Sequence, residues 1–346
     1  MTTKTSGVTI KDVAREAGVS IATVSYVFNE THSVREATKA RVLAAAERLG
    51  YRPSVLARNL RAQRSRILGY GWYRQRGDRW HPILDRFLYS MAEAAEAHDY
   101  HILTFTTPPE RKRWTVYDDL VGTGRVDGFI LSETNAHDSR IRYLMDKDFP
   151  FVAFGRAGEG WDFPYVDIDG EEGIYRATRH LMALGHRRIG FIAWPEGSLT
   201  GHYRSLGYLR AYGESGLSPD PAWTVRSVNE EAAGREAAGA LLALPAGQRP
   251  TALVAVSDLI ALGVMNALRA AGLQPGRDVA VVGFDDIPTA QYLHPSLSSV
   301  RQPIDRVGEL VVTMLLQLID GQPLKARQVL VEPELIVRES SGGSIG

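Results

Sequence analysis

The segment over residues 9–29 limits the fold of this 346-residue chain more than any other part of the sequence. It has the form of two short helices joined by a tight turn. Thr9 and Asp12, three residues apart, form the start signal of the first helix. Gly18 gives the permissive backbone needed just past its end, and Ser20 can cap the second helix at once. Apolar and small side chains would hold the two helices at a steep angle: Val13, Ala14, Val19, Val24 and Val27.

The charge distribution indicates what class of partner this helical pair binds. Residues 1–66 carry 12 of the 40 Lys and Arg residues but only 5 of the 40 Asp and Glu residues. Their net charge is therefore +7, and the net charge of the remaining residues is −7. A basic head on an acidic body suits phosphate binding by the head alone. A helix–turn–helix places its second helix in the DNA major groove, so we expect double-stranded DNA as the partner. A solvated basic helical cap is the alternative.

Composition excludes several classes of protein. The chain has no cysteine, which removes disulfides, Cys-based zinc sites and thiol nucleophiles and fits a reducing cytoplasm. The polar N-terminus has no secretory signal, and no apolar run approaches the roughly 20 residues that span a bilayer. Phosphate-loop and nucleophile-elbow motifs are missing, and the nine His residues are scattered. We therefore expect no enzyme activity, cofactor, metal or membrane contact.

The rest of the chain divides into a short linker and a large α/β core. A third helix is expected over residues 36–49, and Pro53 opens a basic, marginally helical hinge. From residue 67, apolar strands alternate with helices, which predicts two doubly wound parallel-sheet lobes. The strands are expected at 67–72, 101–105, 128–132, 151–154, 188–193, 252–256 and 279–284. The helices are expected at 84–98, 170–184, 204–215, 234–244 and 258–271, and the tail from Ser340 to Gly346 is expected to be disordered.

Ordered motifs along nearly the whole chain resemble the LacI/GalR family of transcription factors. They are Val8-Thr-Ile-Lys-Asp-Val-Ala, Gly18-Val-Ser-Ile-Ala-Thr-Val-Ser, Leu49-Gly-Tyr-Arg-Pro, Ala57-Arg-Asn-Leu60, Val126-Asp-Gly-Phe-Ile, Leu184-Gly-His-Arg-Arg-Ile-Gly-Phe-Ile, Arg204-Ser-Leu-Gly-Tyr, Ser257-Asp258, Val281-Val-Gly-Phe-Asp-Asp286 and Leu297-Ser-Ser-Val-Arg-Gln-Pro303. The resemblance implies a DNA-binding head at 1–51, a hinge at 52–66 and a periplasmic-binding-protein-like core at 67–346. The N-terminal lobe of the core would hold about 67–168 and 300–330. The C-terminal lobe would hold about 169–299 and 331–339.

The resemblance also implies which residues contact DNA. Ile21, Ala22 and Tyr26 would face the bases, where the first two offer only apolar contacts and Tyr26 replaces a frequent Arg of the family. A phosphate or solvent contact is the alternative for Tyr26. Residues suited to phosphate or backbone contact are Thr9, Ser20, Thr23, Ser25, Asn29 and Thr38. In the hinge, Ala57 and Leu60 would approach the minor groove, with Leu60 either wedged into a base step or packed on the partner hinge.

The same resemblance implies an effector site in the core. Arg204 and Asp285 would hold ligand hydroxyls and pair with each other, unless they form a purely structural ion pair. Arg156 would reach Asp285 or the ligand, or be ordinary surface charge. Trp194 would stack on a pyranose ring or lie in the core, and Asp258 would bind the ligand or cap a helix. The remaining candidates are Tyr73, Asn229 and Ser257.

These inferences predict a dimeric repressor whose operator binding is controlled by a small sugar, with induction favoured over corepression. A C-terminal leucine heptad is missing, so a homodimer through the core faces is expected in place of a tetramer. A purine-responsive regulator of the same family, a sugar-binding transport protein and an enzyme are the alternatives. The transport protein would need a secretory signal, and the enzyme would show turnover of a bound sugar.

Overall fold

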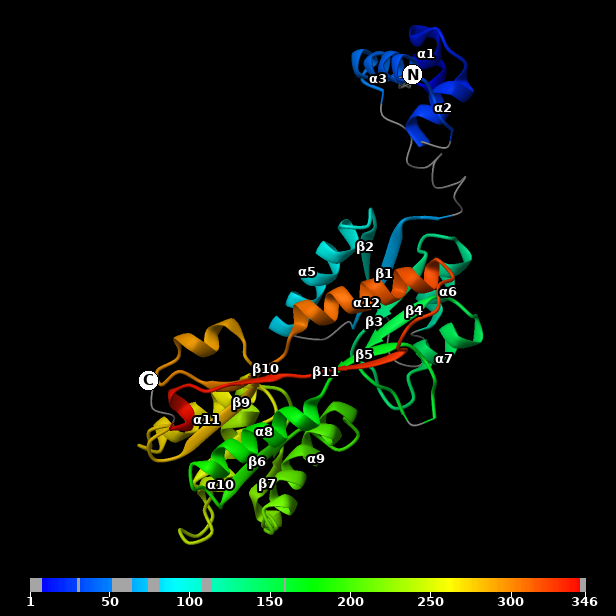
Figure 1. Cartoon of the computed structure of the whole chain (residues 1–346). Coiled ribbons are helices and arrows are strands. Elements are labelled where there is room, and N and C mark those ends of the chain that lie inside the picture. Colours follow the sequence, from blue (N-terminus) through cyan, green and yellow to red (C-terminus); the bar gives the residue numbers. More distant parts are fainter. Residues whose placement is uncertain are drawn as a thin grey trace, which may run out of the picture. The chain divides into compact units, whose positions relative to one another are not determined.

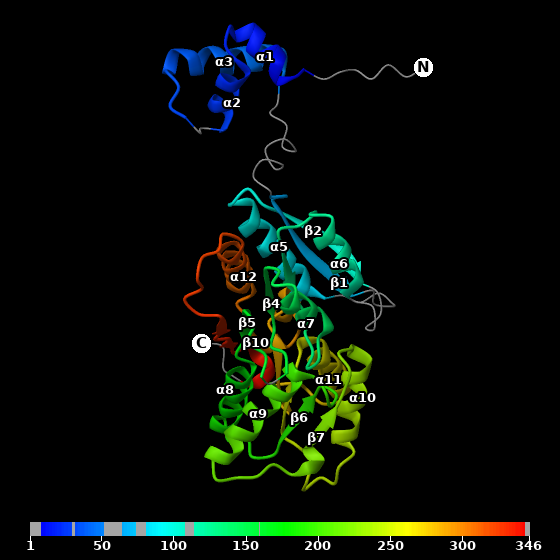
Figure 2. The ribbon, with the colours of Figure 1, turned by 90° about the vertical axis from the view of Figure 1, so that its right-hand side faces the viewer.

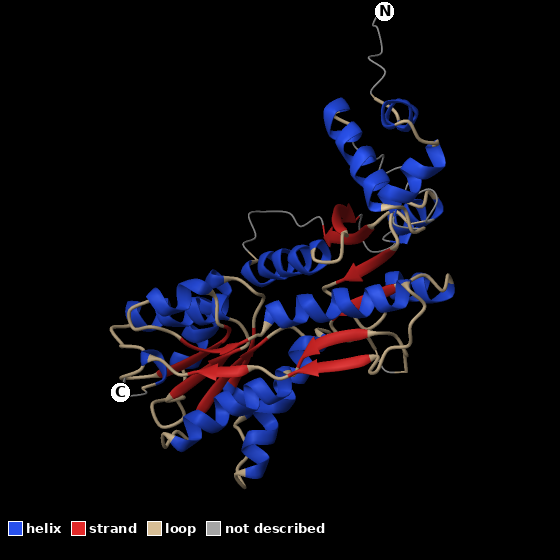
Figure 3. Ribbon diagram, turned by 45° about the horizontal axis from the view of Figure 1, so that its top comes forward, coloured by secondary structure: helices blue, strands red, loops and turns tan. Residues whose placement is uncertain are grey.

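The computed structural model describes residues 8–29, 32–51, 64–73, 81–107, 114–158 and 160–342 (Figure 1). The chain divides into two compact units, residues 1–65 and residues 66–346. Each unit has its own hydrophobic core. The larger unit contains two α/β lobes, in which layers of helices cover central strands (Figure 3).

The small unit is a three-helix head made of α1 (Ile10–Ala17), α2 (Ile21–Asn29) and α3 (Glu36–Leu49). Gly18 ends α1 with a φ of +62°, and the Val19 amide donates to the Ala14 carbonyl across the turn at 3.0 Å. The buried core of this unit comprises Val13, Ala14, Ala17, Val24, Val27, Val42, Ala45 and Ala46. The small residues let the three helices approach closely, and the two helices joined by a tight turn that the sequence predicts are present.

The first lobe contains a six-stranded parallel sheet in the order β11-β5-β4-β3-β1-β2. Its strands are β1 (Ile67–Tyr73), β2 (His101–Thr107), β3 (Gly128–Leu131), β4 (Phe151–Phe154), β5 (Tyr165–Ile168) and β11 (Gln328–Val331), and its helices are α5 (Pro82–Glu96), α6 (Trp114–Gly122), α7 (Ser139–Asp146) and α12 (Ile304–Ile319). Side chains alternate along each strand. Ile130 and Val152 pack with α5 and α12, whereas Phe129 and Phe151 pack with α6 and α7.

The second lobe contains a six-stranded sheet in the order β12-β10-β9-β8-β6-β7, parallel except for the β10–β12 pair. Its strands are β6 (Ile189–Ala193), β7 (Thr224–Arg226), β8 (Ala252–Ala255), β9 (Ala280–Asp285), β10 (Ser298–Arg301) and β12 (Glu334–Ile336), and its helices are α8 (Gly170–Ala183), α9 (Leu199–Glu214), α10 (Glu231–Leu242) and α11 (Asp258–Ala270). The pairs α8–α9 and α10–α11 cover its faces (Figure 2).

The chain passes between the lobes three times: from β5 to α8, from β10 to α12 and from β11 to β12. Two of these passages lie next to the lobe boundaries expected at about residues 300 and 330. Arg301 still pairs within the second sheet, and Val331 still pairs with Ile168 in the first sheet.

The start of the C-terminal tail is ordered, which corrects the expectation of disorder from residue 340. Ser340 and Ser341 are fully buried. The Ser298 amide donates to Ser340 Oγ at 2.8 Å, and Ser341 Oγ lies 2.8 Å from Ser298 Oγ. The tail therefore anchors β9 and β10 of the second sheet, and residues 343–346 lie outside the described residues.

Two glycines of α10 provide a paired test of helix packing in the second lobe. A Cβ on Gly234 would lie 2.4 Å from the Ile260 carbonyl oxygen of α11, whereas a Cβ on the exposed Gly239 would have no heavy atom of another element within 4 Å. We expect Gly234→Ala to lower the free energy of unfolding by about 1–3 kcal/mol. Gly239→Ala should raise it by up to about 1 kcal/mol through helix propensity. Urea unfolding of the full chain, followed by tryptophan fluorescence, measures both, and equal effects would contradict the close helix contact.

Candidate functional site

The exposed face of α2 is the candidate DNA-contacting surface. Ile21 is 46% exposed and Tyr26 is 37% exposed, and Ala22 is also exposed. Ser20 Oγ accepts the Thr23 amide at 3.1 Å and therefore caps this helix. The Tyr26 ring packs edge-on against His32, with ring centroids 4.4 Å apart. Three apolar or aromatic side chains are thus presented to a partner from one helix.

The other predicted DNA contacts differ in their exposure, and some lie outside the described residues. Thr9 is exposed, and its amide and hydroxyl both donate to the Asp12 carboxylate, which lowers the pKa of Asp12. Ser25 and Thr38 are half-buried. The Asn29 side chain and the hinge residues Ala57 and Leu60 lie outside the described residues.

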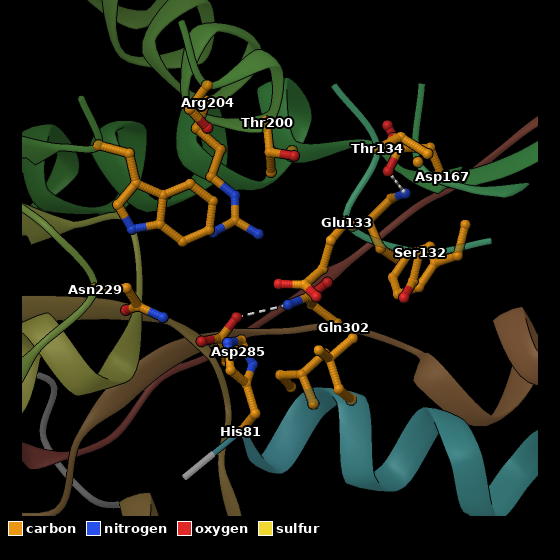
Figure 4. Close-up of a pocket in the computed structure, with 18 of the residues that line it drawn as sticks. His81, Ser132, Glu133, Thr134, Asp167, Thr200, Arg204, Asn229, Asp285 and Gln302 are labelled. Atoms are coloured by element: carbon orange, nitrogen blue, oxygen red, sulfur yellow. Dashed lines mark hydrogen bonds between the residues drawn. The ribbon is translucent and has the colours of Figure 1, made fainter. Parts of the chain in front are cut away.

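A cavity of about 470 Å³ lies between the two lobes of the core. The strands β4, β5 and β9 end at it, which is where ligands bind in open α/β sheets. Figure 4 shows Arg204, Thr200 and Asn229 from the second lobe, Glu133, Thr134 and Asp167 from the first lobe, and the hydrogen bond between Asp285 and Gln302. Five predicted effector residues line the cavity: Arg156, Trp194, Arg204, Asn229 and Asp285. The Tyr73 side chain lies outside the described residues.

Arg204 of α9 is the buried cation of the cavity, with 3% of its surface exposed. Its Nη1 donates to the Val256 carbonyl, and its guanidinium lies 3.6 Å from the Phe284 ring centroid and 4.8 Å from that of Trp194. Its Nε has no hydrogen-bond partner among the described residues. Burial lowers the pKa of Arg204 to about 10, while Asp285 and Asp167 oppose the shift, so the group is charged at neutral pH.

Asp285 is the carboxylate at the end of β9, where its backbone adopts a φ of +125°. Gln302 Nε2 donates to its Oδ1 at 2.6 Å. Burial raises the pKa of Asp285 to about 6, while Arg204 and the bond from Gln302 act in the opposite direction. The predicted direct pairing of Arg204 with Asp285 is wrong for this structure, because no ion pair within 4 Å joins these two described residues.

Arg156 pairs with a residue that the sequence did not single out. Its Nε donates to Asp167 Oδ2 at 2.7 Å, and both side chains are at least 85% buried. The predicted bridge from Arg156 to Asp285 is therefore wrong, because the neighbouring strand β5 supplies a nearer carboxylate. Burial raises the pKa of Asp167, and the Arg156 guanidinium opposes this shift.

Ser257 and Asp258 are fully buried and are not among the residues that line the cavity, so their contact with an effector stays a prediction. Ser257 caps α11 by accepting the Ile260 amide, and its hydroxyl donates to Asn229 Oδ1 at 2.6 Å. Asp258 is fully buried and accepts from Ser299 Oγ at 2.5 Å and from the Ile287 amide at 2.8 Å. The Ser257 bond leaves the Asn229 amide NH₂ free to donate to a ligand.

Comparison with known proteins agrees with this geometry. Residues 9–54 match the model of bacterial regulatory proteins of the lacI family, and residues 178–341 match the periplasmic binding protein-like domain. The HTH-type transcriptional repressor PurR of Aliivibrio fischeri (strain MJ11) is 32% identical over 96% of this chain and 98% of its own. The chain belongs to the LacI family.

Two solved structures extend the likeness to nearly the whole chain. The transcriptional regulator CelR in complex with cellobiose is 29% identical, with a TM-score of 0.72 over 96% of this chain and 99% of its own. The Lac repressor dimer bound to operator and the anti-inducer ONPF is 26% identical, with a TM-score of 0.82 over the same shares. As a LacI-family transcriptional regulator, this protein combines a DNA-binding head with an effector-binding core.

Several polar residues of the cavity were missed from the sequence of this LacI-family chain. They are His81, Ser132, Glu133, Thr134, Asp167, Ser198, Thr200, Tyr203 and Gln302. A signal existed for two of them: Gln302 stands in the recognised Ser-Val-Arg-Gln-Pro segment, and Thr200 follows the strand at 189–193. Asp167 was missed because β5 itself was not predicted.

The described residues contain neither a metal-binding cluster nor a membrane-spanning helix. No group of three or more His, Cys, Asp or Glu side chains there is arranged to hold a metal ion. No helix in that part of the chain has the length and apolar character needed to cross a bilayer.

Proposed function

We propose that this LacI-family protein is a non-enzymatic repressor that binds a pseudo-palindromic operator as a homodimer in the cytoplasm and releases it when a neutral sugar enters the cavity between the lobes. The observation that carries the sugar assignment is the mixture of groups on the cavity wall. Asp285 accepts hydrogen bonds, whereas Arg204 and Asn229 donate them. Sugar hydroxyls both donate and accept, so they match this mixture.

Charge and shape support a neutral ligand. The Arg156 cation is compensated by Asp167 at 2.7 Å, so this pair requires no charge on the ligand. Arg204 and Asp285 face the same cavity with opposite charges. Aromatic surface comes from Phe154, Trp194 and Tyr203, and the volume of about 470 Å³ falls within the usual range for small-molecule sites.

Control of DNA binding follows from the three passages between the lobes. A ligand that contacts both lobes favours one angle between them and shifts the population of chains toward it. The hinge at residues 52–66 joins the head to β1 of the first lobe, so the lobe angle sets the distance between the two hinges of a dimer. A coupling free energy of about 1–3 kcal/mol would change operator affinity by about 5–150-fold.

A ligand screen on the full chain tests this function. We expect neutral mono- and disaccharides, with cellobiose among them, to raise the melting temperature, because a ligand at 100 times its Kd adds about 2.7 kcal/mol. The stabilising sugar should then weaken binding to a duplex that the wild-type protein selects from a random pool, as measured by fluorescence anisotropy. Stabilisation by hypoxanthine or guanine alone, with tighter DNA binding, would establish a purine-responsive repressor and refute the sugar proposal.

A further inference from the structure

One contact joins the walls of the cavity directly across the two lobes. Arg156 follows β4 in the first lobe, and Tyr203 lies on α9 in the second lobe. The Arg156 guanidinium carbon lies 3.4 Å from the centroid of the Tyr203 ring, so the cation rests on the face of the ring. This contact, the Arg156–Tyr203 clamp, is separate from the three chain passages that connect the lobes covalently.

The first-lobe half of the clamp is held in place before it meets Tyr203. Thr134 Oγ1 donates to the Arg156 carbonyl at 2.6 Å and fixes the backbone. Asp167 fixes the side chain through its bond to Nε at 2.7 Å. The ion pair therefore orients the planar guanidinium, and its face remains free to stack. Both contacts that hold Arg156 come from the first lobe. The second lobe contributes only the ring of Tyr203 to the clamp.

We propose that the Arg156–Tyr203 clamp is a positioning contact that stabilises the lobe angle seen here and so sets the response of this repressor to its effector. A cation on an aromatic face contributes most when it is partly desolvated, and the Arg156 side chain is only 15% exposed. Breaking the clamp destabilises only the lobe angle at which Arg156 and Tyr203 are in contact, and leaves other lobe angles unaffected. The balance between lobe angles then shifts without any change in the residues that hold Asp285 or Arg204.

The clamp can be tested without an effector. The chain has no cysteine, so Asp146→Cys on α7 and Glu236→Cys on α10 would place one spin label on each lobe at exposed positions. Double electron–electron resonance on doubly labelled full chains, diluted in unlabelled protein, then reports the distance between the lobes. We expect Tyr203→Leu to lower the ratio of chains at the wild-type distance to chains at other distances by about 3- to 10-fold.

Matched variants separate the clamp from other causes. Tyr203→Phe keeps the aromatic ring and should therefore retain the wild-type distance distribution. Arg156→Lys keeps a charge beside Asp167, but its single ammonium cannot both pair with Asp167 and lie over the ring, so it should behave like Tyr203→Leu, and it serves if that variant fails to fold. Tyr175→Leu removes a similar contact, with Arg210 at 4.0 Å from the Tyr175 ring, that lies wholly within the second lobe, and it should leave the distance unchanged.

The effect on DNA binding rests on the proposed function, whereas the distance measurement does not. Without any sugar, Tyr203→Leu should change the affinity for the selected duplex, because the lobe angle controls operator binding in the proposed function. A distance distribution identical to wild type in both Tyr203→Leu and Arg156→Lys would refute the clamp. A changed distribution with unchanged DNA affinity would refute its link to operator binding, and a protein that ignores all sugars would refute only the effector assignment.

Discussion

Replacing Arg204 by Met should shift the response to the effector to much higher concentrations while leaving DNA binding intact. Arg204 is the buried cation that faces the cavity, and its Nε has no partner among the described residues, so a ligand oxygen can accept from it. Hydrogen bonds from a charged donor contribute about 1.5–3 kcal/mol each, so the loss of one should weaken ligand affinity by about 10- to 150-fold, and the loss of two by more. A titration of the wild-type and variant proteins with the stabilising sugar, followed by fluorescence anisotropy of the bound duplex, measures both effects.

The variant is expected to fold. Among the described residues Arg204 has no ion pair within 4 Å, and Met fills a similar length against the rings of Phe284 and Trp194. The bond to the Val256 carbonyl is lost, at a cost of about 1–3 kcal/mol. Arg210→Met, on the same helix but paired with Glu171 and Glu172 outside the cavity, is the matched control. A variant of Arg204 that still releases DNA at wild-type sugar concentrations would remove this residue from the effector site.

Local sequence signals were sufficient to predict the helices and strands that have a strong apolar pattern or a recognisable cap. The head was predictable because Gly18, Ser20 and the buried valines each act within a few residues of one another. The buried strands β6, β8 and β9 were predictable as apolar runs. The start of α9 was placed at residue 204, five residues late, because Ser198, whose Oγ accepts the Gly201 amide at 3.1 Å, was not recognised as its cap.

Elements that depend on long-range pairing were not predictable from local pattern. The strands β5, β7, β10, β11 and β12 are three or four residues long and were missed. The helices α6, α7 and α12 were also missed, although the regular buried face of α12 is a local signal. Strand β11 pairs with β5 across more than 150 residues of sequence. The same limit explains the errors at the site, because Asp167 reaches Arg156 only after β4 and β5 have paired.

The positions of Ser257 and Asp258 show a second kind of limit. A family motif identifies residues that matter but does not separate those that face a ligand from those that support the wall. Asp258 holds the Ile287 amide and the Ser299 hydroxyl, and so fixes the loop that follows Asp285. Burial and the neighbouring charge of Asp285 raise the pKa of Asp258 well above its usual value. The two carboxyl groups therefore divide the work: Asp258 supports the loop, and Asp285 faces the cavity.

Replacing Asp285 by Asn should stabilise the ligand-free protein and at the same time weaken effector binding. The pKa of Asp285 is raised from 3.8 to about 6, so between these values the folded chain holds a proton that the unfolded chain has released. Stability from this group is therefore fully present below about pH 4 and is lost as the pH rises through about 6. Asn has no charge to bury, so at pH 7.5 we expect a gain of about 1–2 kcal/mol, or about 1–3 °C in melting temperature.

The functional effect of Asp285→Asn runs the other way. A carboxylate accepts hydrogen bonds from sugar hydroxyls more strongly than an amide does, so ligand affinity should fall by about 10- to 100-fold. In the wild-type protein the same affinity should fall as the pH drops below about 6, where Asp285 takes up its proton, and the Asn variant should lose this pH dependence. Calorimetric titrations from pH 5 to pH 8 measure this pH dependence of the sugar affinity.

Asp119→Asn, at an exposed position on α6 outside the cavity, is the control for a simple change in charge. Normal sugar binding by the variant would remove Asp285 from the effector site, and a lower melting temperature would contradict the burial cost that raises its pKa.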